Sequence, residues 1–467
     1  MTRTPRATSI HKVRRDVVGG KRGMGRQLQA QGKRIRRADP RRIEIGKPDA
    51  SLTSVSGLVS FGKFVRGLGV DGELQQLLGD VKSGPQVVYG MAEQVRLLID
   101  ANAVGEQRVF GLESLAADPL FVRLAGGSVP SLDTVYRDLC RLDAPLLGTL
   151  HGVMSRVGLA DLAQLSSMHL DIDTTVEPVF GRQQGALLGY NPRYPGRLSY
   201  HPILAVIAET KLCIGAELRP GDRGLGEEDA ATIGRYVSSV RAKMARDAVL
   251  TVRMDSGADC AEILRSINDA GAFFVVKLKL TPDLLGAMLA TTLWRTVDVD
   301  ADGNPLRQVA ELSFRRESWA KAGKGFRVLA TRYRDRDSGK QVQLWPDLDY
   351  CVQAFVTNNW QFEGGDIVAD YDARAEIEPL IAELKNGVGI AKVPSQDFNA
   401  NHAALLIKLI THNLVRRFVA HVAPALRSWR MPWLWRVLMR VPGRLIRSGR
   451  RWTLRVPPGS PLVTLRC

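Results

Sequence analysis

The sequence predicts an α/β core that is interrupted by a β-rich segment, preceded by a helical domain and flanked by basic arms at both ends. Three observations predict this fold class. Apolar residues recur at helical spacing early in the chain, strands and helices then alternate, and the positive charge is concentrated at the two ends. A chain of 467 residues is also too long for one ordinary compact domain, so we expect several.

Residues 48–163 are expected to form a helical DNA-binding domain. Apolar side chains there recur at helical spacing, as at Met91, Val95 and Leu98, and glycine pairs interrupt the pattern. Ser131 is placed to cap a further helix, which is a candidate for insertion into a DNA groove. The simpler alternative, that this helix only packs against its neighbours, stays open.

The α/β core begins near residue 164, where the pattern changes to alternation with period two and to short apolar runs. Residues 168–174 form the first predicted strand, and residues 249–254 form a later one. We assign residues 164–290 and 359–420 to the core. Residues 291–358 hold strand-like segments joined by Asp-Gly-Asn and Asp-Ser-Gly turn sequences, so we expect a β-rich insertion there.

The net charge of +17 comes from the two ends of the chain. Residues 1–47 hold 15 lysines and arginines against 3 acids, and residues 416–467 hold 12 arginines and no acid. Cationic ends suit a polyanion such as DNA, because each neutralised phosphate releases a condensed counterion. Solvated tails without a partner are the alternative. We expect residues 1–47 to be a disordered arm.

The last segment, residues 421–467, is interpreted as a basic tail rich in Arg and Trp. Its arginines recur every three or four residues, which predicts a cationic face along a helix that is interrupted at Pro442-Gly443. Such a face suits DNA phosphates or an anionic membrane surface, and we expect DNA. The arginines concerned are Arg436, Arg440, Arg444, Arg447 and Arg451.

Several function classes are excluded by what the sequence lacks. No uncharged stretch is long enough to span a bilayer, no apolar leader follows the N-terminus, and the five cysteines are too far apart for a Cys-x-x-Cys metal site. No Gly-rich phosphate loop ending in Lys-Ser/Thr is present, so ATP-driven work is not indicated. We therefore expect a cytoplasmic protein that has no membrane partner.

Two strands place carboxylates where metal chemistry needs them. Asp171 and Asp173 project from the same side of the first strand, because side chains alternate along a strand. Asp255 follows a later apolar strand, at a position where α/β folds present functional groups. Strand periodicity does not choose between Asp171 and Asp173. Each acid also has a structural interpretation as a turn or helix cap.

A predicted helix carries the third candidate acid, Glu378. Tyr371, Arg374, Glu378 and Lys385 lie at i, i+3, i+7 and i+14, which places them on one face of an uninterrupted helix. Taken alone, such a face is usually a solvated set of ion pairs. Taken with the aspartates, it suggests a carboxylate cage for Mg²⁺, with Arg374 and Lys385 available to hold phosphates.

The spacing Tyr-x2-Arg-x3-Glu-x6-Lys resembles the signature around the third acid of DDE transposases of bacterial insertion sequences, and this chain matches all four positions. Asp173, which precedes Thr174, and Asp255 match the first two acids of that family, which favours Asp173 over Asp171. The resemblance implies a ribonuclease H-like core interrupted by a β-rich insertion. It also implies that Asp173, Asp255 and Glu378 are catalytic and bind two Mg²⁺ ions, for which Mn²⁺ substitutes.

The implied activity is binding of the inverted-repeat ends of an insertion sequence, hydrolysis of a phosphodiester there, and joining of the 3′-hydroxyl ends to target DNA. Tyr371, Arg374 and Lys385 are expected to contact DNA together with the arginines of the basic tail. The resemblance also implies a homodimer, since two ends must be brought together, and a bacterial protein associated with the nucleoid. The alternatives are a ribonuclease H-like nuclease without strand transfer and a transposase-derived protein that binds DNA without cutting it.

Overall fold

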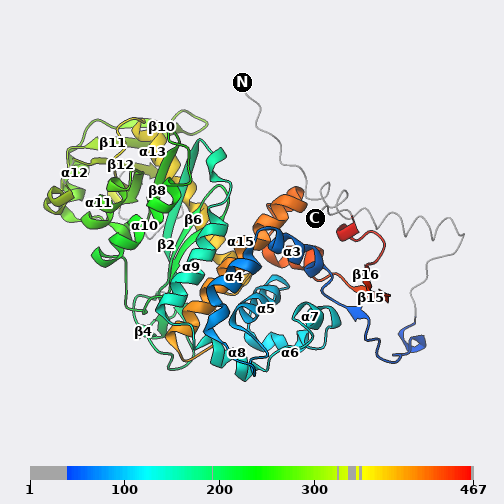
Figure 1. The fold of residues 1–467 in the computed structure, drawn as a ribbon. Coiled ribbons are helices and arrows are strands. Elements are labelled where there is room, and N and C mark those ends of the chain that lie inside the picture. The colour runs from blue at the N-terminus through cyan, green and yellow to red at the C-terminus, as the bar shows by residue number, and fades with distance from the viewer. Residues whose placement is uncertain (1–38, 192, 323–324, 335–342, 346–349, 464–467) are drawn as a thin grey trace, which may run out of the picture. The chain divides into compact units, whose positions relative to one another are not determined.

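The computed structural model describes residues 39–191, 193–322, 325–334, 343–345 and 350–463 (Figure 1). The disordered arm expected at residues 1–47 therefore falls largely outside the described residues. The chain forms two compact units, one from Met1–Val153 with Glu383–Cys467 and the other from Met154–Ala382. Each is described separately below.

The second unit is built on a sheet whose central strands run in the order β7-β6-β2-β8-β9. Strand β2 pairs antiparallel with β6, and β6 pairs antiparallel with β7, whereas β2, β8 and β9 are mutually parallel. Figure 1 shows β6, β2 and β8 side by side. The strands are β2 (Ser167–Thr174), β6 (Ile203–Ile207), β7 (Leu212–Glu217), β8 (Val249–Met254) and β9 (Phe273–Lys277).

Helices cover both faces of this sheet. The strands' inward-facing residues form one core with α10 (Ala230–Arg241), α11 (Ala261–Asp269) and α12 (Pro282–Ala290). On the opposite face, α13 (Gly364–Asp372) packs its Ile367 and Val368 on a smaller apolar cluster. The alternation of strands and helices predicted for the core is confirmed.

The segment predicted to be rich in strands does form strands, but they lengthen the same sheet. β14 pairs antiparallel with β9, and β12, β11 and β10 follow it outward. The insertion is therefore continuous with the core sheet, because the backbone groups of β9 that face away from β8 bond to β14. The added strands are β10 (Arg295–Val299), β11 (Pro305–Leu312), β12 (Arg327–Arg334), β13 (Gln343–Trp345) and β14 (Tyr350–Thr357).

The first unit is mainly helical, as predicted. Ser131 caps α8 as expected, since its Oγ accepts a hydrogen bond from the Thr134 amide at 3.3 Å. The long helix α15 is buried along most of its length and packs on α3, α5 and α8, although its residues were assigned to the α/β core. The main helices are α3 (Gly57–Gly67), α4 (Val70–Leu78), α5 (Met91–Ala103), α7 (Pro119–Leu124), α8 (Leu132–Leu139) and α15 (Phe398–Val422), and α9 (Ala144–Gly158) crosses the boundary of the two units.

The C-terminal segment is helical through α16 (Met431–Leu434) and a π-helical turn (Trp435–Met439) and then forms a β-hairpin, so the predicted helix face is wrong beyond that turn. β15 (Gly443–Ser448) pairs with β16 (Arg451–Arg455) and with the short strand β1 (Leu52–Thr53). Pro442 cannot continue a helix, and Gly449, with φ of 59°, occupies the left-handed region in the turn between the strands. The three- and four-residue spacing of the arginines therefore does not place them on one helix. No helix among the described residues is long and apolar enough to cross a membrane.

Candidate active site

The polar face of β2 carries the first group of candidate residues. His169, Asp171 and Asp173 lie on this face, while Met168, Leu170 and Ile172 point into the core on the other. The prediction that both aspartates share one side of the strand is confirmed, because the side-chain alternation of a regular strand is kept through this segment.

Asp171 is buried and paired with Arg253, its neighbour on the parallel strand β8. Arg253 donates from Nε and Nη2 to the two carboxylate oxygens of Asp171 at 2.7 and 2.9 Å. Both side chains are almost completely shielded from solvent. This bidentate pair uses both oxygens of Asp171, so it is a structural contact in this conformation.

The Asp171–Arg253 pair is the centre of a longer chain of charged groups. Arg253 Nη1 donates to the backbone oxygen of Asp370 at 2.7 Å, and the Asp370 carboxylate lies 2.9 Å from His169 Nε2. Glu209 lies 2.6 Å from the other ring nitrogen of His169. Burial opposes a charged imidazole here, but the hydrogen bonds to Asp370 and Glu209 outweigh it and raise the pKa of His169 to about 9. This network links β2 and β8 to α13.

Asp173 and Asp255 leave neighbouring strands at the same edge of the sheet. Ile172 pairs with Met254 across the parallel strands, so the residues that follow them, Asp173 and Asp255, are adjacent. Asp255 also caps a short 3-10 turn, because its Oδ1 accepts a hydrogen bond from the Gly257 amide at 3.0 Å. The structure therefore brings the first two candidate acids together.

The third segment is not one continuous helix. Tyr371 lies on α13, Arg374 lies on a 3-10 turn (Ala373–Glu376), and Glu378 lies in the first turn of the separate helix α14 (Ile377–Asn386). Pro379 explains the break, since its ring would clash with the carbonyl of residue 375 in a continuous α-helix. The prediction that the four signature residues share one face of an uninterrupted helix is wrong.

Arg374 nevertheless faces the acids. Its side chain is 9% exposed, and Nη2 lies 3.0 Å from Asp173 Oδ2. Burial raises the pKa of Asp173 to about 6; Arg374 opposes this rise, and the nearby charges of Asp255 and Glu378 add to it. The three acids therefore repel one another at Asp173, and one cation only partly relieves this repulsion.

Tyr371 and Lys277 complete the surroundings of the acids. The Tyr371 ring packs on Phe355 with centroids 4.6 Å apart, and burial raises the pKa of its hydroxyl to about 12. Lys277, the last residue of β9, has a pKa that burial lowers, with Asp255 opposing the change and Arg374 adding to it. Sequence reasoning missed Lys277, although a lysine that ends an apolar strand next to the Asp255 strand was a usable signal.

The remaining DNA-binding candidates lie in the other unit. Lys385 is in the last turn of α14. Arg440 donates to Val104 O at 2.6 Å and pairs with Glu106, whereas Arg444 pairs with Asp49 at 3.1 Å. All five of these arginines are exposed. Of the other three, Arg436 lies over the Trp433 ring, Arg447 on β15 lies near the Trp452 ring, and Arg451 begins β16.

The acids do not form a ready-made metal cage as they stand. In the described part of the chain, no group of three or more His, Cys, Asp or Glu side chains is arranged to hold a metal ion. The donor set still fits a hard divalent cation, because it consists of carboxylates and because Asp255 and Glu378 lie close enough to Asp173 for their charges to act on it. Arg374 supplies positive charge beside Asp173 in this conformation.

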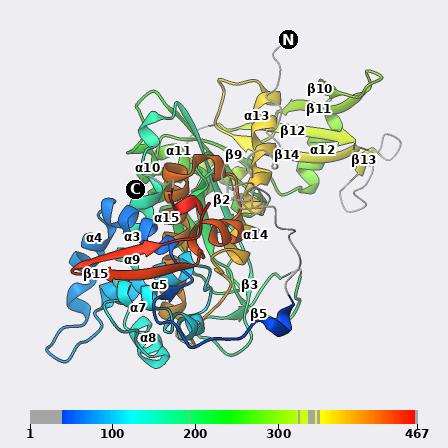
Figure 2. The ribbon, with the colours of Figure 1, turned by 90° about the vertical axis from the view of Figure 1, so that its right-hand side faces the viewer.

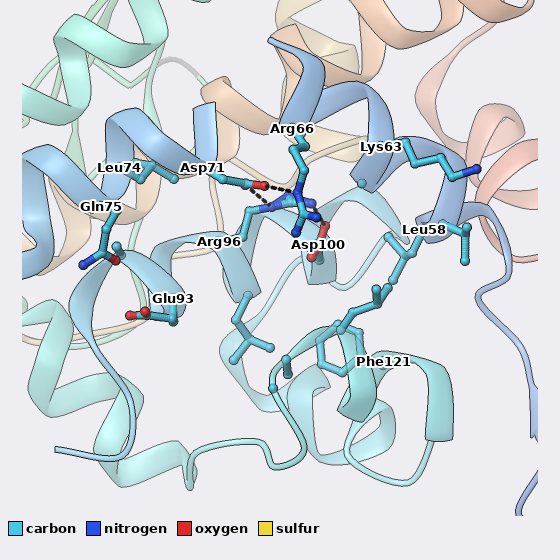
Figure 3. Close-up of a pocket in the computed structure, with 17 residues that line it drawn as sticks. Leu58, Lys63, Arg66, Asp71, Leu74, Gln75, Glu93, Arg96, Asp100 and Phe121 are labelled. Atoms are coloured by element: carbon cyan, nitrogen blue, oxygen red, sulfur yellow. Dashed lines mark hydrogen bonds and ion pairs between the residues drawn. The ribbon is translucent and has the colours of Figure 1, made fainter. Parts of the chain in front are cut away.

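A cavity of about 500 Å³ lies in the helical unit and not at the acids (Figure 3). Arg96 bridges Asp71 at 3.0 Å and Asp100 at 3.1 Å on its wall. Burial raises the pKa of Asp100 to about 6, while Arg96 opposes the rise. These ion pairs join α4 to α5, and none of the candidate acids lines this cavity.

Comparison with known families identifies the class of protein. The family model described as Transposase DDE domain group 1 matches residues 36–465, and the chain belongs to this family. Membership implies DNA transposition activity and a transposase enzyme, and DDE transposases generally use divalent metals.

The chain was also compared with solved structures and with curated proteins. A chain in the cryo-EM structure of a piggyBac transposase synaptic complex with hairpin DNA is 12% identical to this one. The match covers 82% of this chain and 80% of that chain, with a TM-score of 0.41. No curated protein matches the sequence.

Proposed function

We propose that this chain is the transposase of a bacterial insertion sequence, which cleaves the inverted-repeat ends of its element and joins the 3′-hydroxyl ends to target DNA. One observation carries the proposal: Asp173 and Asp255 leave adjacent parallel strands at one edge of the sheet, and Arg374 and Glu378 reach the same place from a segment more than 100 residues further along the chain.

The central strands support assignment of a ribonuclease H-like core. Three antiparallel strands, β7-β6-β2, continue into the parallel strands β8 and β9, and the first two acids lie at the ends of β2 and β8. Helices α10 and α11 connect the later strands on one face. The insertion follows as strands β10 to β14 before the third acid.

Asp173, Asp255 and Glu378 would hold two Mg²⁺ ions, for which Mn²⁺ would substitute. Bound divalent ions supply Lewis acidity for phosphodiester hydrolysis and for strand transfer. Asp173 is the first acid in this proposal, because Asp171 is almost completely buried in its bidentate pair with Arg253, whereas Asp173 is more exposed and lies near the charges of Asp255 and Glu378. No covalent bond between protein and DNA is needed.

The other side chains orient these carboxylates. Arg374 holds the Asp173 carboxylate by its Oδ2, while the Thr174 amide donates to Oδ1 at 2.8 Å. Tyr371 packs against Phe355 and keeps the turn that carries Arg374 against the sheet. Lys277 adds positive charge beside Asp255. This positive charge suits the scissile phosphate, which is the role that we assign to Arg374 and Lys277 when the carboxylates are occupied.

Double-stranded DNA is the proposed partner, first as element ends and then as target, with a homodimer joining two ends. The cationic ends of the chain, Lys385 and the exposed arginines of the C-terminal hairpin would contact phosphates outside the cleavage site.

The test is to incubate the protein with a labelled element end and Mg²⁺ and to search for a 3′-hydroxyl product, then to supply precut ends and a plasmid. We expect both cleavage and joining. Cleavage without joining would favour a nuclease, and binding without cleavage would favour a silent DNA-binding protein.

A further inference from the structure

A small separate sheet follows the first acid directly. Its strands are β3 (Glu177–Pro178), β4 (Leu187–Leu188) and β5 (Leu198–Tyr200), in the order β3-β5-β4, and Figure 2 shows β3 next to β5. The sheet connects β2 to β6. The Thr175 amide donates to Pro202 O at 3.0 Å where the two connections meet, so both ends of the sheet are tied to the strand that carries Asp173.

Buried side chains and hydrogen bonds hold this small sheet in place. Tyr200 is fully buried, and its hydroxyl donates to Gln184 O at 2.7 Å. Asn191 Oδ1 accepts a hydrogen bond from the Tyr194 amide at 3.0 Å. Gly189 approaches a neighbouring loop so closely that a Cβ there would lie 1.8 Å from Gly221 O. These contacts give the small sheet a defined conformation.

Three aromatic rings are exposed on the strands and loops of this small sheet. Phe180 is 82% exposed, Tyr190 is 79% exposed and Tyr194 is 42% exposed, although Val179 and Ala186 beside them are buried. Scattered exposed apolar residues need no explanation, but three exposed rings within 15 residues indicate a binding surface.

Arginines lie over these rings. The Arg197 guanidinium lies 4.8 Å from the Phe180 centroid and 5.6 Å from the Tyr194 centroid, and Arg193 lies 5.8 Å from Tyr194. Among the described residues, neither guanidinium pairs with a carboxylate. Stacking on a ring leaves the in-plane N–H groups of arginine directed outward, where they suit phosphate.

The charge of the segment points to nucleic acid. Residues 178–200 include three arginines and no acid, so the segment is cationic, although the loop that approaches Gly189 carries the exposed Asp222. Protein partners of such a surface would need to be acidic, whereas DNA matches both features at once, since phosphates suit the arginines and bases suit the rings. A paired duplex hides the faces of its bases, so exposed rings favour an unpaired strand.

We propose that Phe180, Tyr190, Arg193, Tyr194 and Arg197, the aromatic–arginine surface, bind an unpaired stretch of DNA on the segment that follows Asp173. The proposal rests on the proposed function for the identity of the nucleic acid. Phe180 follows Asp173 by seven residues, so it lies within about 25 Å of it even if the chain were fully extended. Strand separation around a cleavage site would bring unpaired bases into this range.

The test measures binding of the full-length protein to a fluorescein-labelled oligothymidine and to a duplex of the same length by anisotropy. Each base that stacks on an aromatic ring contributes to the free energy of binding. Phe180→Ala and Tyr190→Ala should therefore each weaken oligothymidine binding by about 5- to 100-fold and duplex binding much less. Phe180→Trp should restore affinity. Its added tryptophan fluorescence, measured against the wild-type protein, should be quenched by oligothymidine.

Matched controls separate stacking from general surface effects. Phe362→Ala removes a ring that is 46% exposed elsewhere in the same unit, and Arg265→Ala removes an arginine whose side chain is 61% exposed on α11. Both should bind oligothymidine as the wild type does. Thermal unfolding of each variant verifies that the fold is retained.

Unchanged oligothymidine affinity in Phe180→Ala and Tyr190→Ala would overturn the inference, as would equal losses for oligothymidine and duplex. The proposed function is tested separately, by cleavage with the acid variants. If the ring variants lost oligothymidine binding and the wild-type protein did not cleave, the aromatic–arginine surface would stand and the transposase proposal would be rejected. If the wild-type protein cleaved normally and the ring variants bound oligothymidine as the wild type does, the transposase proposal would stand and this inference would be rejected.

Discussion

Asp171 and Arg253 face each other across the parallel strands β2 and β8, joined by two hydrogen bonds of 2.7 and 2.9 Å. The pair is buried, and the third guanidinium nitrogen donates to the backbone of Asp370 on α13. The same arginine therefore withdraws Asp171 from solvent and ties α13, which leads to Arg374 and Glu378, to the strands of the first two acids.

Breaking this pair should destabilise the protein. Arg253→Met leaves the Asp171 carboxylate buried without a partner, so we expect the free energy of unfolding to fall by about 3–5 kcal/mol in urea denaturation at pH 7. The double variant Asp171→Leu with Arg253→Met should recover much of that loss, because neither charge remains buried. A double variant no more stable than the single one would contradict this account.

The three acids should be needed for cleavage and not for binding. Asp173→Asn, Asp255→Asn and Glu378→Gln keep the shape of each side chain but remove the charge that would hold a divalent ion, so each should abolish cleavage of an element end and leave its affinity nearly unchanged. Asp171→Asn is the matched control on the same strand face. If it lost cleavage while keeping its fold and Asp173→Asn cut normally, the choice of first acid would be wrong.

Divalent-ion binding should depend on pH through Asp173. Its pKa is raised to about 6, so a proton competes with the ion as the pH falls through 6, and Mn²⁺ affinity measured by calorimetry should be weaker at pH 5.5 than at pH 7.5. Arg374→Ala removes the cation that opposes this rise and should move the profile to higher pH. Lys385→Ala serves as the comparison and should leave the profile in place.

His169 should make stability depend on pH in the alkaline range. Its pKa in the folded protein is about 9, above the ordinary value of 6.5, so protonation stabilises the fold. That contribution is complete below about pH 6.5 and is lost as the pH rises toward and through 9. Urea unfolding midpoints of the wild type should fall over this window more steeply than those of His169→Gln. Parallel curves for the two proteins would rule out this role.

The arginines of the C-terminal segment should differ in their contribution to DNA binding. Arg436 and Arg451 are exposed, so Arg436→Gln or Arg451→Gln should each reduce the slope of log K against log salt by about 0.9 if the side chain meets a phosphate. Arg440 is held by Val104 and Glu106, so Arg440→Gln should lower the thermal midpoint more than it changes this slope. Identical slopes for the three variants and the wild type would show that this segment does not bind DNA.

Local patterns determined the parts of the site that depend on neighbouring residues. Alternation along β2 placed Asp171 and Asp173 on one face, and the apolar run of β8 placed Asp255 at a strand end. The helical spacing near Glu378 predicted the relative positions of the four signature residues only in part. Helical periodicity assumes an uninterrupted helix, and Pro379 interrupts this one.

The sequence by itself determined the order of strands and helices in the core from β2 to β9, the cationic ends and the positions of the candidate acids, since each follows from periodicity, composition or spacing within a short window. Tertiary structure alone decided that Asp171 is the aspartate buried against Arg253, because Arg253 lies 82 residues from Asp171 and reaches it only through strand pairing. It likewise brought Lys277 beside Asp255 and placed Arg444 and Arg451 on paired strands. Those outcomes depend on hydrogen bonds between distant segments, which the spacing of residues along one segment does not encode.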